Sequence, residues 1–314
     1  MAPFSEFFPQ TTFLTRFSGA LQAVALSPNQ RWVVAAQAQS NRPTPTLTLF
    51  DRYAPRTQRR VLRQTEHWSH AVFDAVFVDD NHLLFLEEPT TGQHAYQLLD
   101  LRTGDTQTLL TLPRQYRWPR LRAGGGLLLA PTTPPVLYDV SARQAVRQVL
   151  LPPQIAAGAV FGTDDAQHVL VTTAEHRFFE RFDLDAQRVV QRYDLPVAVW
   201  GTPFASRNYC GAIGDGSNGA YLWHKATGEP VGATWLNSRQ SYVFSFCLSP
   251  DEQRVGIGTI SGLVYVVEIE SGDFVFSERL HGHDRVWALA FSTDGQILVS
   301  GGSRGDVMVT ELPR

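Results

Sequence analysis

Residues 280–312 of this chain form the stretch LHGHDRVWALAFSTDGQILVSGGSRGDVMVTEL. Two apolar runs in it, VWALAF and ILVS, are separated by the polar turn STDG. The segment SGGSRG, taken as a second turn, separates them from a third run, VMVTE. Short apolar runs joined by tight turns are typical of antiparallel strands in hairpins. The stretch therefore predicts a small antiparallel sheet of consecutive strands.

The end of the third run recurs along the whole chain. A bulky residue at the end of a strand-like run is followed each time by an acid or a histidine, and successive copies are 39 to 49 residues apart. The bulky residues are Phe50, Leu99, Tyr138, Phe182, Trp223, Val267 and Thr310. A period of roughly 40–45 residues with four short strands per unit is the spacing of β-propeller blades.

Two kinds of turn recur in phase with this marker. Small polar turns follow apolar runs in ALSPNQ (25–30), VFVDDN (76–81), VFGTDD (160–165), CLSPDE (247–252) and AFSTDG (290–295). Glycine-containing turns follow the acid in LRTGDT (101–106), KATGEP (225–230) and IESGDF (269–274). Residues of these types reverse the chain tightly between hydrophobic runs. Three markers with one phase predict a repeat protein of seven units.

Residues 280–312 resemble one WD repeat in their Gly282-His283 pair, V-x-x-L-x-F strand and S-x-D-G turn. The resemblance implies an all-β fold: a seven-bladed β-propeller with four-stranded antiparallel blades. It also implies that the loops between blades and those between second and third strands form one face, called the top. The family often locks a blade with a buried His–Ser–Asp–Trp network. Only the last blade keeps the first two, as His283 and Ser300, with Arg304 and Thr310 in the other positions.

The chain ends too early for the seventh blade to have its own outer strand, because only three residues follow Glu311. TTFLTRF, residues 11–17, has the alternation of a strand and supplies the missing one. Pairing the first strand with the last removes an open sheet edge and closes the ring. We therefore expect one propeller domain over residues 1–314, with residues 1–10 as a tail.

Composition limits the class of protein. Hydrophobic residues make up 43% of the chain and charged residues 18%, which is typical of a globular domain. A formal net charge of −3 makes nucleic acid an unlikely partner and a membrane surface an unexpected one. Cys210 and Cys247 lie in apolar runs and can pack as small core residues or form one disulfide. Without an apparent signal sequence or a long apolar segment, we expect a cytoplasmic protein.

The sequence contains no recognisable catalytic constellation. Among the six inner strands that can be placed, Asp74 is the only acid and histidine is absent, so these strands alone cannot supply a calcium or zinc site. His67 with His70, and His281 with His283, could bind a metal, but loop histidines without a third ligand are more often solvated or structural. We expect no cofactor and no catalytic metal. A small-ligand or metal-dependent propeller enzyme, such as a lactonase-like hydrolase, stays open as the alternative.

Aromatic residues recur near the start of the inner strands. In each inner strand, the residue four positions before the last apolar residue can be compared between blades. It is aromatic in four of them, as Phe73, Trp200, Phe244 and Trp287. In the third blade it is Trp118 or Arg117, and the exceptions are Gln22 and Ala157. Nearby loops add Trp68, Tyr242 and Arg285. The resemblance places these residues at the top of the channel, where relatives often contact partners.

Tryptophan, tyrosine and arginine are enriched at binding hot spots, although large strand residues also pack between blades. We therefore expect a non-catalytic scaffold whose top face binds a protein or peptide through these side chains. The alternative is that they form part of the core.

Overall fold

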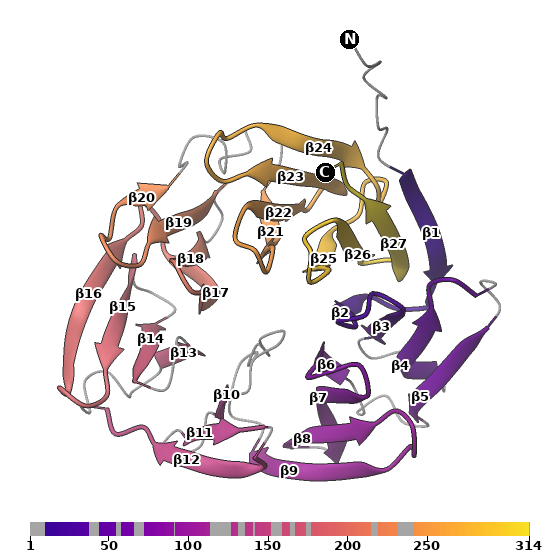
Figure 1. Ribbon diagram of the computed structural model, residues 1–314, viewed down its shortest axis with the longest axis horizontal. Coiled ribbons are helices and arrows are strands. Elements are labelled where there is room, and N and C mark those ends of the chain that lie inside the picture. Colours follow the sequence, from indigo (N-terminus) through magenta and orange to yellow (C-terminus); the bar gives the residue numbers. More distant parts are fainter. Residues whose placement is uncertain are drawn as a thin grey trace.

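The computed structural model describes residues 10–37, 44–54, 58–65, 72–90, 92–113, 127–130, 136–140, 142–151, 159–163, 167–173, 177–214, 219–231 and 242–313. Every regular element in these ranges is a β-strand, and the strands form seven antiparallel sheets. The sheets stand around a ring with their first strands innermost (Figure 1). The seven-bladed β-propeller expected from the repeat is confirmed.

The blades are numbered in chain order. Blade one consists of β2 (Leu21–Leu26), β3 (Trp32–Gln37), β4 (Thr44–Asp51) and β5 (Arg59–Thr65). Blade two consists of β6 (Val72–Phe77), β7 (His82–Thr90), β8 (Gln93–Asp100) and β9 (Thr106–Pro113). Blade three shows β10 (Leu127–Ala130), β11 (Val136–Asp139) and β12 (Gln144–Gln148). Residues 114–126, which include the expected inner strand of blade three, lie outside the described residues.

The remaining blades each have four strands. Blade four consists of β13 (Ala159–Thr163), β14 (His168–Thr173), β15 (Phe178–Asp183) and β16 (Arg188–Asp194). Blade five consists of β17 (Val199–Ala205), β18 (Tyr209–Gly214), β19 (Ala220–His224) and β20 (Pro230–Val231). Blade six consists of β21 (Val243–Leu248), β22 (Arg254–Thr259), β23 (Leu263–Glu268) and β24 (Phe274–Arg279). Blade seven consists of β25 (Val286–Phe291), β26 (Ile297–Gly302), β27 (Asp306–Glu311) and β1 (Gln10–Arg16).

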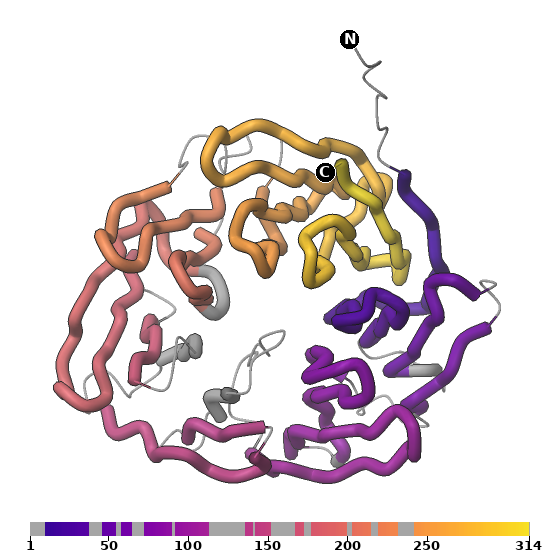
Figure 2. Tube along the Cα trace, in the orientation of Figure 1, coloured from indigo at the N-terminus to yellow at the C-terminus, as the bar shows by residue number. Residues whose placement is uncertain are grey.

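The N-terminal strand closes the ring, as expected. β1 pairs antiparallel with β27, from Gln10 opposite Glu311 to Arg16 opposite Asp306. The two chain ends therefore share one blade, where the indigo and yellow segments run together (Figure 2). The strand begins one residue earlier than the expected range 11–17, and Phe17 follows it as a buried residue whose backbone N–H donates to Gly305 O at 2.9 Å.

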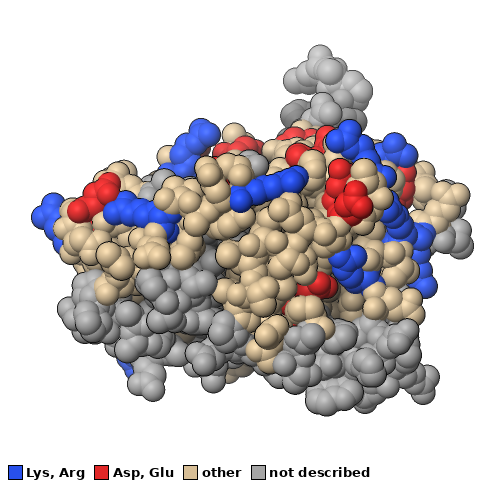
Figure 3. Space-filling view, turned by 90° about the horizontal axis from the view of Figure 1, so that it is seen from below, with Lys and Arg blue, Asp and Glu red and all other residues tan. Residues whose placement is uncertain are grey.

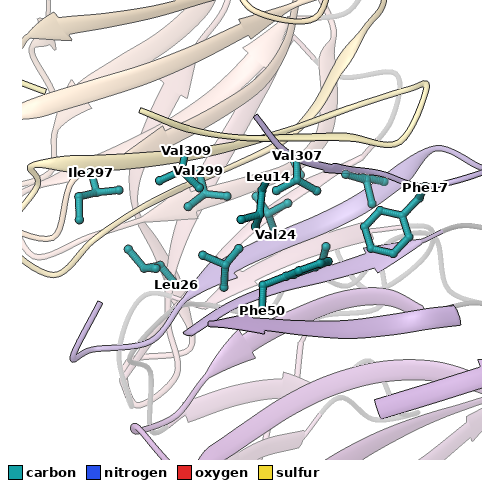
Figure 4. Close-up of a cluster of buried hydrophobic side chains, with 13 residues drawn as sticks. Leu14, Phe17, Val24, Leu26, Phe50, Ile297, Val299, Val307 and Val309 are labelled. Carbon is teal, nitrogen blue, oxygen red and sulfur yellow. The ribbon is translucent and has the colours of Figure 1, made fainter. Parts of the chain in front are cut away.

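Closure buries an apolar cluster between blades seven and one. Leu14 and Phe17 pack with Val307 and Val309 of β27 and with Phe50 of blade one (Figure 4). The rings of Phe17 and Phe50 meet edge to face with centroids 6.0 Å apart. Burial of this kind contributes about 25 cal/mol for each Å² of apolar surface removed from water. The closing strand is thus held by core packing as well as by its hydrogen-bond ladder.

The turns between first and second strands share one design in blades one, six and seven. In each, a serine hydroxyl accepts the backbone N–H of the residue five positions later and donates to an acid or amide two positions later. These serines are Ser27, Ser249 and Ser292. Side chains that bond their own turn in this way fix the hairpin geometry. In these three blades the polar turns quoted from the sequence therefore set where the inner strand ends.

Outer-strand arginines join neighbouring blades. Arg60 of β5 donates to Leu101 O in blade two at 2.6 Å, and Arg147 of β12 donates to Leu184 O in blade four at the same distance. Arg63 also donates to Thr106 Oγ1 of blade two at 2.6 Å. Seen edge-on, arginine and acidic side chains of the described residues lie among uncharged ones along the rim of the disc (Figure 3). At least part of the arginine-rich run in β5 therefore has a structural role between blades.

Candidate functional site

The lock in the last blade uses a different histidine from the one expected. His281 is 2% exposed, and its Nε2 lies 2.8 Å from Ser300 Oγ. His283 is exposed, and its Nδ1 lies 3.3 Å from Arg279. The expectation that His283 fills this position is therefore wrong. The segment SGG also differs from the expected turn, because Ser300, Gly301 and Gly302 belong to β26.

The loop of residues 280–285, between β24 and β25, is tied to turns on both sides. Toward blade six, its His281 N–H donates to Gly262 O at 3.2 Å. Within blade seven, Asp284 pairs with Arg304 at 2.8 Å, and Ser303 N–H donates to Arg285 O at 2.8 Å. A loop held at several points presents its side chains in a fixed arrangement, which lowers the entropy lost on binding. This loop leads directly into the inner strand that carries Trp287.

A β-bulge occurs at the second residue of four inner strands. The register shifts between Leu21 and Ala23, Val72 and Asp74, Val243 and Ser245, and Val286 and Ala288. The residues at these bulges are Gln22, Phe73, Phe244 and Trp287. Bulges leave one residue out of the ladder and turn its side chain in a new direction, often next to binding sites. The position picked out in the sequence is thus a repeated structural feature at the top of the inner strands.

The structure brings three of the expected binding residues together between blades six and seven, and a fourth lies beside them in the chain. The rings of Phe244 and Trp287 meet edge to face with centroids 4.6 Å apart. The guanidinium carbon of Arg285 lies 5.6 Å from the centroid of Phe244. Tyr242, 48% exposed, comes directly before β21 and so lies two residues from Phe244. We call these four residues, Tyr242, Phe244, Arg285 and Trp287, the six–seven seam.

The other expected residues lie apart from the seam or outside the described part. Phe73 is half-buried against the core of blade two, with its ring 5.0 Å from that of His94. Trp200 lies in β17, where the pairing slips between Trp200 and Phe204, and its side chain is not described. Trp68, Arg117 and Trp118 fall outside the described residues. The expected set is therefore divided, and its described part is concentrated in blades six and seven.

Chemical groups for metal binding do not come together in the described part of the chain. It contains no group of three or more histidine, cysteine, aspartate or glutamate side chains placed to hold a metal ion. Cys210 and Cys247 are both free thiols, and burial raises the pKa of Cys247 well above its usual value. No helix in the described ranges is long and apolar enough to span a membrane.

Comparison with known proteins bears on the last blade most directly. The family model described as "WD domain, G-beta repeat" matches residues 274–309. These residues are similar to a WD repeat. A WD repeat-containing protein of Schistosoma mansoni, SL1-17, is 26% identical over 133 residues, which cover 42% of this chain and 42% of that protein. Both findings support a relation to WD-repeat proteins.

A solved structure supports the architecture. The computationally designed Ika8 protein aligns with a TM-score of 0.65 over 95% of this chain and 98% of its own, at 17% identity. At this identity the likeness shows the fold alone. The propeller architecture of the chain therefore rests on its own sheet topology and on this structural likeness, and the likeness to a WD repeat on residues 274–309.

Proposed function

We propose that this chain is a non-catalytic scaffold that binds a protein or peptide at the six–seven seam on its top face. The observation that carries the proposal is the joint placement of a tryptophan, a phenylalanine and an arginine at two adjacent bulges and the rigid loop between them. Partly exposed aromatic and arginine side chains in a pre-organised frame are the residue types that dominate binding energy at interfaces.

The seam differs from ordinary packing between blades. Core side chains of the same strands, Val243 and Val286, are 5% and 0% exposed, whereas Phe244 and Trp287 remain half-buried and Arg285 is exposed. Both strands alternate between buried and half-buried residues at this end, and Phe244 and Trp287 lie on the half-buried side. The bulges in addition leave these two residues outside the regular ladder. A partner that covers the seam would bury the remaining aromatic surface and gain hydrophobic free energy.

The test is quantitative affinity purification from the native cell with wild type, Trp287→Ala, Arg285→Ala and Gln22→Ala. Gln22 occupies the equivalent bulge of blade one without an aromatic ring, so it is the matched control. We expect the partner to be retained by wild type and Gln22→Ala and reduced at least about tenfold by either seam variant, as for a hot-spot residue. Thermal melts must show that each variant is folded. Equal recovery of the same proteins by all four forms would contradict the proposal.

A further inference from the structure

The charges around the six–seven seam are unequally matched. Asp284 of the loop pairs with Arg304 at 2.8 Å, and Asp306 of β27 pairs with Arg16 of the closing strand. Glu278, exposed in β24 beside Arg279, is the one further acid close to the loop in the chain. Arg285 has no ion pair among the described residues, and its one ring contact is with Phe244. Although the whole chain carries a net charge of −3, this part of the top face therefore has a local excess of positive charge.

A second arginine strengthens this excess. Arg279, at the end of β24, donates to the backbone carbonyls of Ser261 and Gly282 and contacts His283. All three partners are uncharged or weakly basic, so the guanidinium is held in place without being neutralised. An arginine fixed in this way can still give its remaining N–H groups to a carboxylate.

The seam also contains a hydrogen-bond donor that lacks an acceptor. Trp287 Nε1 is buried and has no partner among the described residues. A buried donor left unpaired destabilises the free protein, and Trp287 Nε1 is the one such atom among the described residues that belongs to the seam. A ligand oxygen brought to the edge of the indole after a small rotation of the side chain would relieve this cost. The missing group is an acceptor, which agrees with the sign of the surrounding charge.

We propose that the six–seven seam recognises a peptide segment in which a carboxylate side chain stands next to an aromatic or aliphatic one. The carboxylate pairs with Arg285, with Arg279 adding to the field, and the apolar neighbour packs on Phe244 and Trp287. This inference rests on the proposed function, because it specifies the partner of the same surface. The Arg285 guanidinium lies beside the rings of Phe244 and Trp287. A peptide therefore binds well only if it carries both the carboxylate and the apolar side chain.

The experiment is selection of random heptapeptides on immobilised wild type, Arg285→Glu and Arg102→Glu. Arg102 is an exposed arginine in the turn after β8, on the opposite face, so its reversal changes the net charge equally. We expect wild type and Arg102→Glu to enrich peptides with Asp or Glu beside an aromatic or aliphatic residue, and Arg285→Glu to lose this bias. For the best peptide, changing its acid to the amide should weaken binding about tenfold, as should Arg285→Gln in the protein.

Two results would overturn the inference, and they differ in what they say of the proposed function. Enriched peptides that lack acidic residues but lose binding in Trp287→Ala would refute the acidic partner and leave the seam as a binding site. No enrichment on folded wild type, or enrichment unaffected by both Trp287→Ala and Arg285→Glu, would remove the seam as a peptide-binding surface and the inference with it. Circular dichroism of each variant confirms that the comparison is between folded proteins.

Discussion

His281 is a buried side chain whose charge state is coupled to the folding of blade seven. Its ring sits against Gly302, where an added Cβ would approach Nδ1 to 2.5 Å, so the pocket has no room for a larger neighbour. Burial lowers the pKa of His281 from 6.5 to about 4, although Asp306 and Asp284 oppose this shift. The folded protein therefore holds the neutral imidazole, while the unfolded chain takes up a proton near its ordinary pKa.

This coupling predicts a stability loss in mildly acidic solution. Because the folded pKa is depressed, the stabilisation is fully present above pH 6.5 and is lost as pH falls toward 4. Between pH 7 and pH 5 we expect the free energy of unfolding to fall by about 2 kcal/mol from this group. Denaturant titrations of wild type and His281→Gln measure it, and the variant should show a smaller loss. Equal losses in the two proteins would show that other groups carry the pH dependence.

At the scale of elements, hairpin turns place residues other than glycine in the left-handed region. Glu252 has φ 60° and Gln187 has φ 52°. Equivalent positions hold glycine in some blades, at Gly295 and Gly228 respectively, and a non-glycine residue in others, at Gln30 and Arg143. Glu252 accepts hydrogen bonds from Asn208 of blade five, at 2.7 Å from its side-chain Nδ2, whereas the Gln187 side chain, among the described residues, donates to Leu184 O of its own turn. The two strained residues thus differ in whether they connect blades.

Glycine substitutions separate these two roles. Gln187→Gly is expected to change stability by about 0 to +1 kcal/mol, because it relieves the positive φ and loses one local hydrogen bond. Glu252→Gly is expected to lower stability by about 1 kcal/mol, because the loss of its bonds to Asn208 outweighs the relief. Thermal melts measure both, and Asn208→Ala in the Glu252→Gly background should add little. An increase in stability in Glu252→Gly would show that the hydrogen bonds between Glu252 and Asn208 make no net contribution to the free energy of unfolding.

The closing strand offers a matched pair of substitutions on its two faces. Leu14 is 5% exposed and packs in the cluster between blades seven and one, while Phe13 is 37% exposed. Leu14→Ala should cost about 2–5 kcal/mol, as for other buried leucines, and Phe13→Ala less than half of that. Chemical denaturation gives both values. Similar costs at the two positions would mean that the hydrogen-bond ladder, and not core packing, holds β1.

At the scale of the whole molecule, periodic features were predictable and contacts between repeats were not. Strand spacing and turn residues recur once per blade, so the seven blades and the closing strand could be inferred, and the alignment of inner strands found the bulge positions. Whether His281 or His283 bonds Ser300 depends on how the loop of residues 280–285 folds between two turns. The repeat spacing of the sequence carries no information about that loop conformation. The bonds from Arg60 and Arg147 to the next blade escaped prediction for the same reason.

The ring as a whole leads to a prediction about how unfolding spreads. β1 precedes blade one in the chain but forms the outer strand of blade seven. Loss of β1 therefore exposes the edge of β27 and removes Leu14 and Phe17 from the apolar cluster shared with blade one. Repeat architectures are stabilised by contacts between nearest neighbours, so damage should be greatest beside the break. We expect deletion of residues 1–17 to lower the melting temperature sharply. Hydrogen–deuterium exchange with mass spectrometry should show the largest increase in amide exchange in β25–β27 and β2–β4. Strands β13–β16 of blade four should keep more of their protection from exchange. Uniform loss around the ring would instead mean that the propeller opens as a single cooperative unit, and unchanged exchange in β27 would contradict the closing role of the N-terminal strand.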